Sequence, residues 1–276
     1  MSHLITDLSL SWPLFQEILI FLLLGSVAGL TAGLFGVGGG LIIVPTLLWV
    51  FSSHGVDQSI VMHLAVGTSL ATIIVTSLSS MYAHNKRKAI QWGEFLMLAP
   101  GIVIGAWLGA AVADLLSTLW LQRVFAAFAM MVALHLFLDM DFGKHNNLPG
   151  KLGMSVAGAV IGMVSSIVGI GGGSMTVPYL HWNGVDIRRA VATSSACGLP
   201  IALAGTIGFI VTGWNEEALP NGSLGYVYWS AMPWIVVATF IMAPIGANLA
   251  HSLPTKILRR LFAMLMFVVG IKLMLS

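Results

Sequence analysis

Two glycine clusters form the most specific pattern in this sequence. The segment 36–45 reads GVGGGLIIVP and the segment 169–178 reads GIGGGSMTVP, and both interrupt long apolar stretches. Three consecutive glycines cost a continuous helix about 1 kcal/mol each relative to alanine, so we expect a helix to end at each cluster. A short helix beginning there would present unpaired N–H groups and the positive end of its dipole. Two such helix ends would bind an anion without a buried lysine.

Hydroxyl side chains recur at matching places in the helices that follow the clusters, and they could donate hydrogen bonds to an anion. Packing is the alternative for the glycines, because small residues let membrane helices approach closely. Bonding to carbonyls of the same helix is the alternative for the hydroxyls. The predicted substrate-binding residues are Gly38, Gly39, Gly40, Gly171, Gly172, Gly173, Ser174, Thr68, Ser69, Thr193 and Ser194.

Composition places these motifs in a membrane. Of the 276 residues, 58% are hydrophobic and only 8% are charged. Apolar stretches of about 18 residues or more, each long enough to span a bilayer, recur along the chain. We therefore predict an all-α polytopic membrane protein with two short helices, 40–52 and 173–182, after the glycine clusters. The eight long helices are expected at 14–35, 58–83, 93–114, 119–139, 153–170, 188–213, 227–250 and 255–275.

The chain reads as two repeats, each of about four long helices and one short helix. The first covers 14–139 and the second 153–275, joined by a polar linker at 140–152 with glycine and proline punctuation. Basic residues mark cytoplasmic loops, which places the linker and the loop at 86–88 inside and the segment 214–217 outside. The loop after the second long helix then lies inside in one repeat and outside in the other. This predicts inverted repeats, with a substrate site where the broken helices meet.

Smaller glycine patterns predict helix packing rather than binding. They are Gly25-xxx-Gly29-xxx-Gly33, Gly105-xxx-Gly109 and Gly158-xxx-Gly162. Among ionisable residues, Arg188 is interpreted as an orientation charge, and His63 as interfacial or as a weaker candidate for proton coupling. We expect no metal, no cofactor and no enzymatic activity, because no catalytic motif is present. A net charge of +2 without a basic face argues against nucleic-acid binding.

The paired Gly-x-Gly-Gly-Gly-x-x-x-Val-Pro-x-Leu motifs at 36–47 and 169–180 resemble those of the sulfite exporter TauE/SafE family of bacterial permeases. The basic segment 84–92 is similar to a loop of that family. The resemblance implies a multi-pass protein of the bacterial inner membrane that transports small sulfur-containing anions such as sulfite, thiosulfate or organosulfonates, often outward. The expected partners are a small anionic solute and the lipid bilayer, and the oligomeric state stays open. An anion channel, an importer of a related oxyanion and an accessory protein without flux are the alternatives.

Overall fold

The computed structural model describes residues 18–31, 39–138, 148–252 and 255–275, with side chains between 244 and 259 described only in part. Gly38 and most of the predicted linker lie outside the described residues. Helices make up most of the described chain, and five of them are long and apolar enough to cross a membrane. The prediction of an all-α polytopic membrane protein is confirmed at this level.

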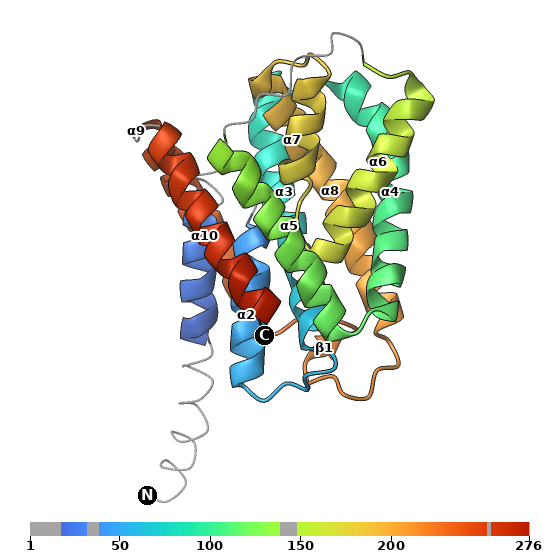
Figure 1. Cartoon of the computed structure of the whole chain (residues 1–276), viewed down its shortest axis with the longest axis vertical. Coiled ribbons are helices and arrows are strands. Elements are labelled where there is room, and N and C mark those ends of the chain that lie inside the picture. Colours follow the sequence, from blue (N-terminus) through green and yellow to red (C-terminus); the bar gives the residue numbers. More distant parts are fainter. Residues whose placement is uncertain (1–17, 32–38, 139–147, 253–254, 276) are drawn as a thin grey trace, which may run out of the picture.

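The helices follow one another with short connections (Figure 1). A first helix, Ile18–Thr31, precedes the first glycine cluster. One small antiparallel hairpin pairs Ser223 with Tyr228 and Leu224 with Val227. The elements are α2 (Gly40–Ser53), α3 (Val61–Lys86), α4 (Trp92–Leu115), α5 (Thr118–Leu138), α6 (Lys151–Val168), α7 (Gly173–Trp182), α8 (Ile187–Thr212), β1 (Ser223–Leu224), β2 (Val227–Tyr228), α9 (Met232–Ser252) and α10 (Thr255–Leu275).

The two short helices begin at the glycine clusters, as predicted. Helix α2 has 14 residues and α7 has 10. At about 1.5 Å per residue neither reaches across a hydrocarbon core of about 30 Å. In Figure 1 both start near the middle of the bundle, α2 running to its lower end and α7 to its upper end. The described glycines of the two clusters, where α2 and α7 begin, therefore lie inside the bundle and not at its surface.

Glycines bring two helix pairs into close contact. A methyl group on Gly158 or Gly162 of α6 would overlap backbone atoms of α4 at Leu98 and Ile102. A methyl group on Gly25 of the first helix would likewise overlap Ile235 of α9, and one on Gly29 would overlap Thr239. Gly105 and Gly109 of α4 pack against α6 in the same way. The prediction of helix packing is confirmed for these glycines, and Gly33 lies outside the described residues.

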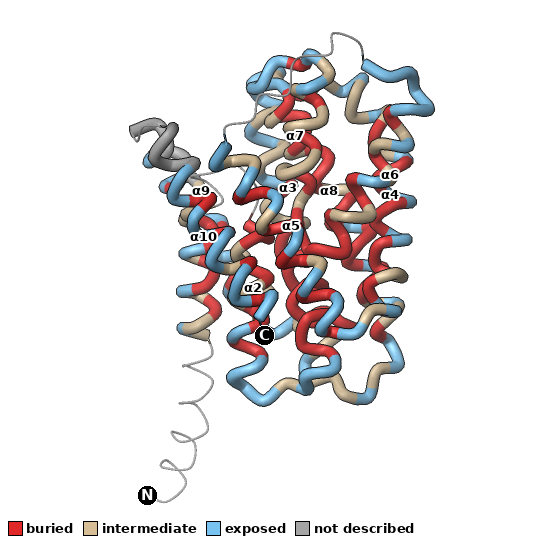
Figure 2. Tube along the Cα trace, in the orientation of Figure 1, coloured by how far each residue is buried: buried red, intermediate tan, exposed pale blue. Residues whose placement is uncertain are grey.

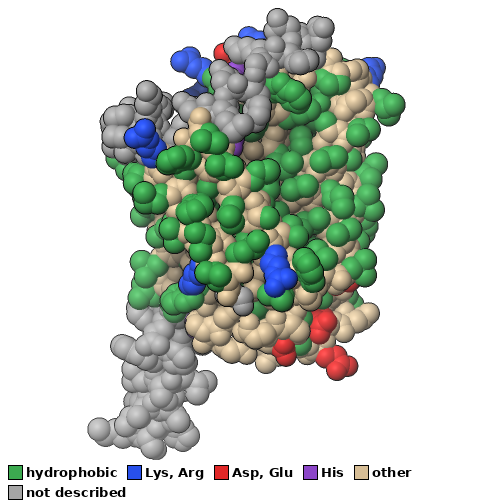
Figure 3. Space-filling model, viewed as in Figure 1, with side chains coloured by type: hydrophobic (Ala, Val, Ile, Leu, Met, Phe, Trp, Pro, Cys, Tyr) green, Lys and Arg blue, Asp and Glu red, His purple; other side chains and the backbone are tan. Residues whose placement is uncertain are grey.

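Buried residues lie at the centre of the bundle, and apolar and acidic side chains occupy different parts of the surface. Figure 2 shows buried residues concentrated on α3 and α8, which cross at the middle of the bundle. Figure 3 shows apolar side chains over most of the visible face of the bundle, with acidic side chains mainly at its lower edge. The predicted helix at 227–250 begins later than expected, at Met232, because Val227 and Tyr228 pair with β1 instead.

Candidate functional site

The second glycine cluster breaks the chain with two left-handed residues. Gly169 ends α6 with φ +75°, and Gly172 precedes α7 with φ +58°. The N–H of Ile170 donates to the carbonyl of Ser165 at 2.9 Å, which closes the end of α6. Only glycine adopts such backbone angles without strain. The break is therefore a local property of the glycine sequence, as the cluster predicted.

The two glycine clusters meet inside the bundle. A Cβ on Gly40, the first residue of α2, would overlap the carbonyl oxygen of Gly169 and lie 2.9 Å from the Cα of Ile170. The hydroxyl of Ser69 on α3 donates to that same carbonyl at 2.8 Å. Gly40 and Ser69, two predicted site residues of the first half, thus share one junction with Gly169, a residue of the second cluster that was not among the predicted binding residues. The contact is direct backbone packing, which leaves no space for a side chain.

Backbone N–H groups at the start of both short helices precede the helical hydrogen-bond ladder. In α2 the ladder begins when Ile42 and Ile43 donate to the carbonyl of Gly39. In α7 it begins when Met175 and Thr176 donate to Gly172. The amides of Gly40, Leu41 and Ser174 come before those bonds. Such groups, at the positive ends of two helix dipoles, suit a negative ligand.

Unpaired hydroxyls surround the start of α7. Ser174 and Thr176 each have a buried hydroxyl with no hydrogen-bond partner in the described part of the chain. A Cβ on Gly172 would lie 3.3 Å from the Thr176 hydroxyl oxygen, so that hydroxyl adjoins the break. An unsatisfied buried hydroxyl costs about 1–3 kcal/mol, which a ligand or water would recover. Thr176 was missed by sequence reasoning, because isoleucine (Ile43) occupies the equivalent place in the first cluster.

The two predicted threonines make matching bonds across the bundle. Thr68 on α3 accepts from the backbone N–H of Tyr228 at 2.9 Å. Thr193 on α8 accepts from the backbone N–H of Gln91 at 3.0 Å. Both threonines are fully buried. Each hydroxyl therefore holds an extended segment of the opposite half, and its own hydrogen is the only group left to donate to a ligand.

Charged side chains do not contribute to this interior. The buried polar residues of the described chain are hydroxyls together with His63 and Gln122, and none is Lys, Arg, Asp or Glu. Ser194 lies among them on α8. No group of three metal-ligating side chains forms within the described residues. The electrostatics of the junction come from helix dipoles and hydroxyls, a combination that favours anions.

His63 lies away from the junction, near the end of α4. Its Nε2 contacts the carbonyls of Ala113 and Leu116 at 2.9 and 3.0 Å, and its ring packs against Tyr226. The Tyr226 hydroxyl donates to Asp114 at 3.1 Å. Burial, and then the Asp114 carboxylate, raise the pKa of Tyr226, so the phenol stays protonated and acts as a donor. His63 is buried, and its contacts with the carbonyls of Ala113 and Leu116 cap the end of α4.

Two cavities lie outside the junction, and neither is lined by Gly40 or Gly169. One, of about 500 Å³, is lined by Gln91, Glu94 and Arg189 at the end of the bundle where α8 begins. The other, of about 680 Å³, lies beside α2 and is lined by its residues from Leu41 onward. The junction itself is closed in this conformation, since Gly40 is buried against Gly169.

Comparison with known proteins agrees with these features. A family model described as sulfite exporter TauE/SafE matches residues 21–273. A probable membrane transporter protein of Haemophilus influenzae is 36% identical over 95% of this chain and 100% of its own length. Two more probable membrane transporter proteins, MJ0441 of Methanocaldococcus jannaschii and YunE of Bacillus subtilis, are each 26% identical, covering 91% and 94% of this chain and 93% and 97% of their own. No solved structure gives a significant match.

Proposed function

This chain belongs to the sulfite exporter TauE/SafE family, and from that premise we propose that it carries small sulfur-containing anions out of the cell by alternating access. It is a membrane transporter, in keeping with its relatives and its apolar helices. The observation that carries the proposal is the junction of Gly40 with Gly169, where the start of α2 packs against the second glycine break in the opposite half. The proposed substrates are sulfite, thiosulfate or organosulfonates, and the proposed location is the bacterial inner membrane.

The proposed architecture is a pair of inverted repeats, 14–139 and 153–275. Helices α2 and α7 run in opposite directions from the middle of the bundle in Figure 1. Contacts recur in pairs: Gly109 packs on Met163, and Gly246 packs on Leu30, at corresponding places in the two halves. The bonds of Thr68 and Thr193 form a second such pair. Two halves that exchange the same contacts support a twofold relation, which is the arrangement that alternating access uses.

In the proposed mechanism the anion lies between the starts of α2 and α7. Backbone amides of Gly39, Gly40, Gly171, Gly172 and Ser174 face it, and the hydroxyls of Ser174 and Thr176 donate to its oxygens. Ser69, Thr68, Thr193 and Ser194 frame the site from α3 and α8. The closed packing of Gly40 on Gly169 supports a carrier over an open channel. An inside-negative potential drives an anion outward by about 2.3 kcal/mol per charge per 100 mV.

Replacing Thr176 with valine tests the binding site. The change removes a buried hydroxyl that has no partner, so we expect the free protein to be as stable as the wild type or up to about 1–3 kcal/mol more stable. Anion binding should weaken about tenfold, because one hydrogen bond to a charged group contributes about 1.5–3 kcal/mol. The measurements are thermal unfolding with and without sulfite, thiosulfate and sulfoacetate, followed by flux in proteoliposomes.

The matched control is Thr46→Val on α2. The Thr46 hydroxyl already donates to the carbonyl of Ile42 at 2.7 Å within its own helix, and it lies outside the proposed site. This variant should keep wild-type anion affinity. Equal affinities for all tested anions in wild type and Thr176→Val would contradict the assignment of the site. A wild-type protein that moves none of these anions would contradict the proposed substrates.

Orientation gives an independent prediction. Cys197 is buried and is the sole cysteine in the sequence, so an introduced cysteine can be labelled selectively. Lys86 and Glu217 are exposed at opposite ends of the bundle. We expect an impermeant maleimide to label Glu217→Cys in intact cells and Lys86→Cys only after the membrane is opened. The reverse labelling pattern would overturn the proposed orientation.

A further inference from the structure

The 680 Å³ cavity has the chemistry of a second binding site. It lies between the first helix, α2, α5 and α10, and most of its wall is apolar. Its polar lining residues are Thr46, Ser52, Gln58, Thr118, Gln122 and Lys272. Two of them are already satisfied, since Thr46 donates to Ile42 and Thr118 donates to Ser59. The groups left for a ligand include a buried amide and an ammonium.

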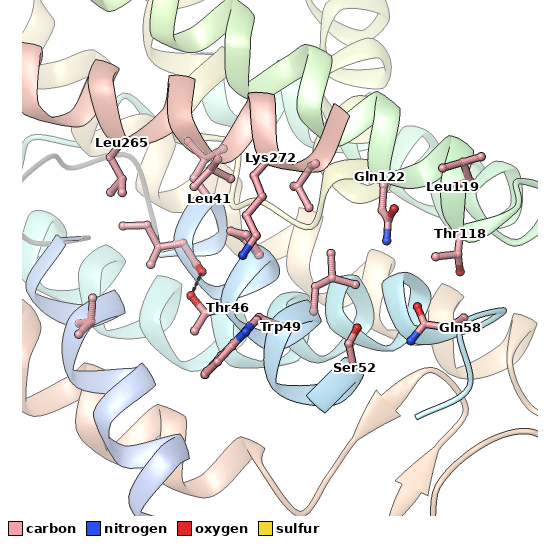
Figure 4. A pocket seen from close by; sticks show the side chains of 16 residues that line it. Leu41, Thr46, Trp49, Ser52, Gln58, Thr118, Leu119, Gln122, Leu265 and Lys272 are labelled. Carbon is pink, nitrogen blue, oxygen red and sulfur yellow. Dashed lines mark hydrogen bonds between the residues drawn. The ribbon is translucent and has the colours of Figure 1, made fainter. Parts of the chain in front are cut away.

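Gln122 is the buried polar group that points to a ligand. It is only 8% exposed, and its amide has no hydrogen-bond partner in the described part of the chain. Figure 4 shows its amide directed from α5 into the cavity. The amide borders the open volume of the cavity, so an occupant that accepts its N–H groups would form hydrogen bonds there.

Lys272 adds a positive charge to the same cavity. Figure 4 shows its side chain reaching from α10 toward Thr46 and Trp49 on α2. Lys272 lies in the last turn of α10, and no described carboxylate forms an ion pair with it. An ammonium and an amide at one cavity select an anionic group. The apolar wall selects a hydrocarbon body attached to that group.

Size and position identify the class of occupant. A cavity of this volume suits a drug-sized molecule rather than a lone oxyanion. Its rim carries exposed apolar side chains, with Trp49 62%, Leu119 43% and Leu265 40% exposed. These residues belong to the apolar band of a membrane-spanning bundle, so acyl chains reach the cavity from the side. Lysines near helix ends lie at the depth of lipid headgroups.

We propose that the cavity binds an anionic phospholipid. Lys272 pairs with the phosphate, the Gln122 amide donates to ester oxygens of the headgroup, and an acyl chain lies along α2 and α10. The lipid would thereby contact α2, the helix that starts at the glycine junction. The site is separate from the proposed anion pathway, and its test does not depend on transport.

Thermal unfolding in nanodiscs of phosphatidylcholine, with increasing phosphatidylglycerol, tests the proposal. Phosphatidylglycerol should stabilise the wild-type protein. An equal amount of added phosphatidylcholine should not. Lys272→Gln should need about fivefold more phosphatidylglycerol for the same effect, since one basic residue contributes about that factor near an anionic surface. Gln122→Leu should fold, because it removes an unpartnered amide, and it should weaken the effect as well.

Arg123→Gln is the matched control. It removes the same charge from the neighbouring residue of α5, whose guanidinium lies over the Trp120 ring and outside the cavity lining. This variant should respond to phosphatidylglycerol as the wild type does. Equal stabilisation of wild type and Lys272→Gln, or an equal response to both lipids, would overturn the proposal. Stabilisation by thiosulfate that requires Lys272 and no lipid would assign the cavity to a soluble anion instead.

Discussion

Gly40→Ala is expected to slow transport about tenfold or more in protein that still reaches the membrane. The new methyl group would overlap the carbonyl oxygen of Gly169 and approach the Cα of Ile170. Both are backbone atoms, so no rotamer change relieves the overlap. The start of α2 must then move away from the second glycine break. Overpacking of this kind costs about 1–3 kcal/mol, and about 1.4 kcal/mol corresponds to a factor of ten.

The control for this prediction is Gly93→Ala. Gly93 lies in the first turn of α4, and a Cβ there would meet nothing within 4 Å. The same chemical change should therefore leave expression, thermal stability and flux unchanged. The measurements are membrane yield, thermal unfolding and anion flux in proteoliposomes for both variants. Wild-type flux by a well-inserted Gly40→Ala protein would show that contact between the two breaks is not required.

Gly172→Ala separates the role of backbone conformation from that of contact. Gly172 has φ +58°, a region that costs an alanine roughly 1–2 kcal/mol. A Cβ there would also lie 2.6 Å from Cδ1 of Ile201, a flexible side-chain end that can move. We therefore expect a milder loss of flux than at Gly40. A larger loss than at Gly40 would place the critical contact at the start of α7 alone.

Local sequence patterns predicted the breaks well because glycine acts through its own backbone. The bounds 40–52 and 173–182 differ from α2 and α7 by at most one residue. The sequence also predicted the glycine stripes that pack α6 on α4. A residue without a Cβ can be recognised in the sequence even when the neighbouring helix is not known. The sequence around Thr176 does not distinguish it from a serine or threonine whose hydroxyl bonds to its own helix. Only the folded structure shows that its hydroxyl has no hydrogen-bond partner in the described part of the chain.

The features that the sequence analysis did not predict depend on contacts between distant segments of the chain. The segment around Val227 is apolar and was predicted to be helical, yet Tyr228 donates its N–H to Thr68 and pairs with Ser223. Thr68 lies 160 positions away from Tyr228, so no window along the chain contains both residues. The cavity beside α2 was likewise not predicted, because Gln122 and Lys272 belong to different repeats and meet only in the folded bundle.

Thr68→Val and Thr193→Val are expected to shift access to the junction in opposite directions. Each removes the acceptor of one buried amide, that of Tyr228 or of Gln91, at a cost of about 1–3 kcal/mol. Thr68 lies toward the end of the bundle that carries Asp57 and Glu217, and Thr193 toward the end that carries Lys86. Loss of one bond loosens one end, and a shift of about 1.4 kcal/mol changes the ratio of two conformations tenfold.

A cysteine at Ser174 reports this shift, because it lies at the start of α7 while Cys197 is buried. With an impermeant maleimide in oriented vesicles, Thr68→Val should speed labelling from the proposed outer side, and Thr193→Val from the proposed inner side. Thr68→Ser and Thr193→Ser keep the acceptor and should label as the parent does. If both valine variants sped labelling from the same side, the two bonds would not be related by the proposed inverted symmetry. The opposite shifts would follow only if the matching bonds close the two ends of one pathway.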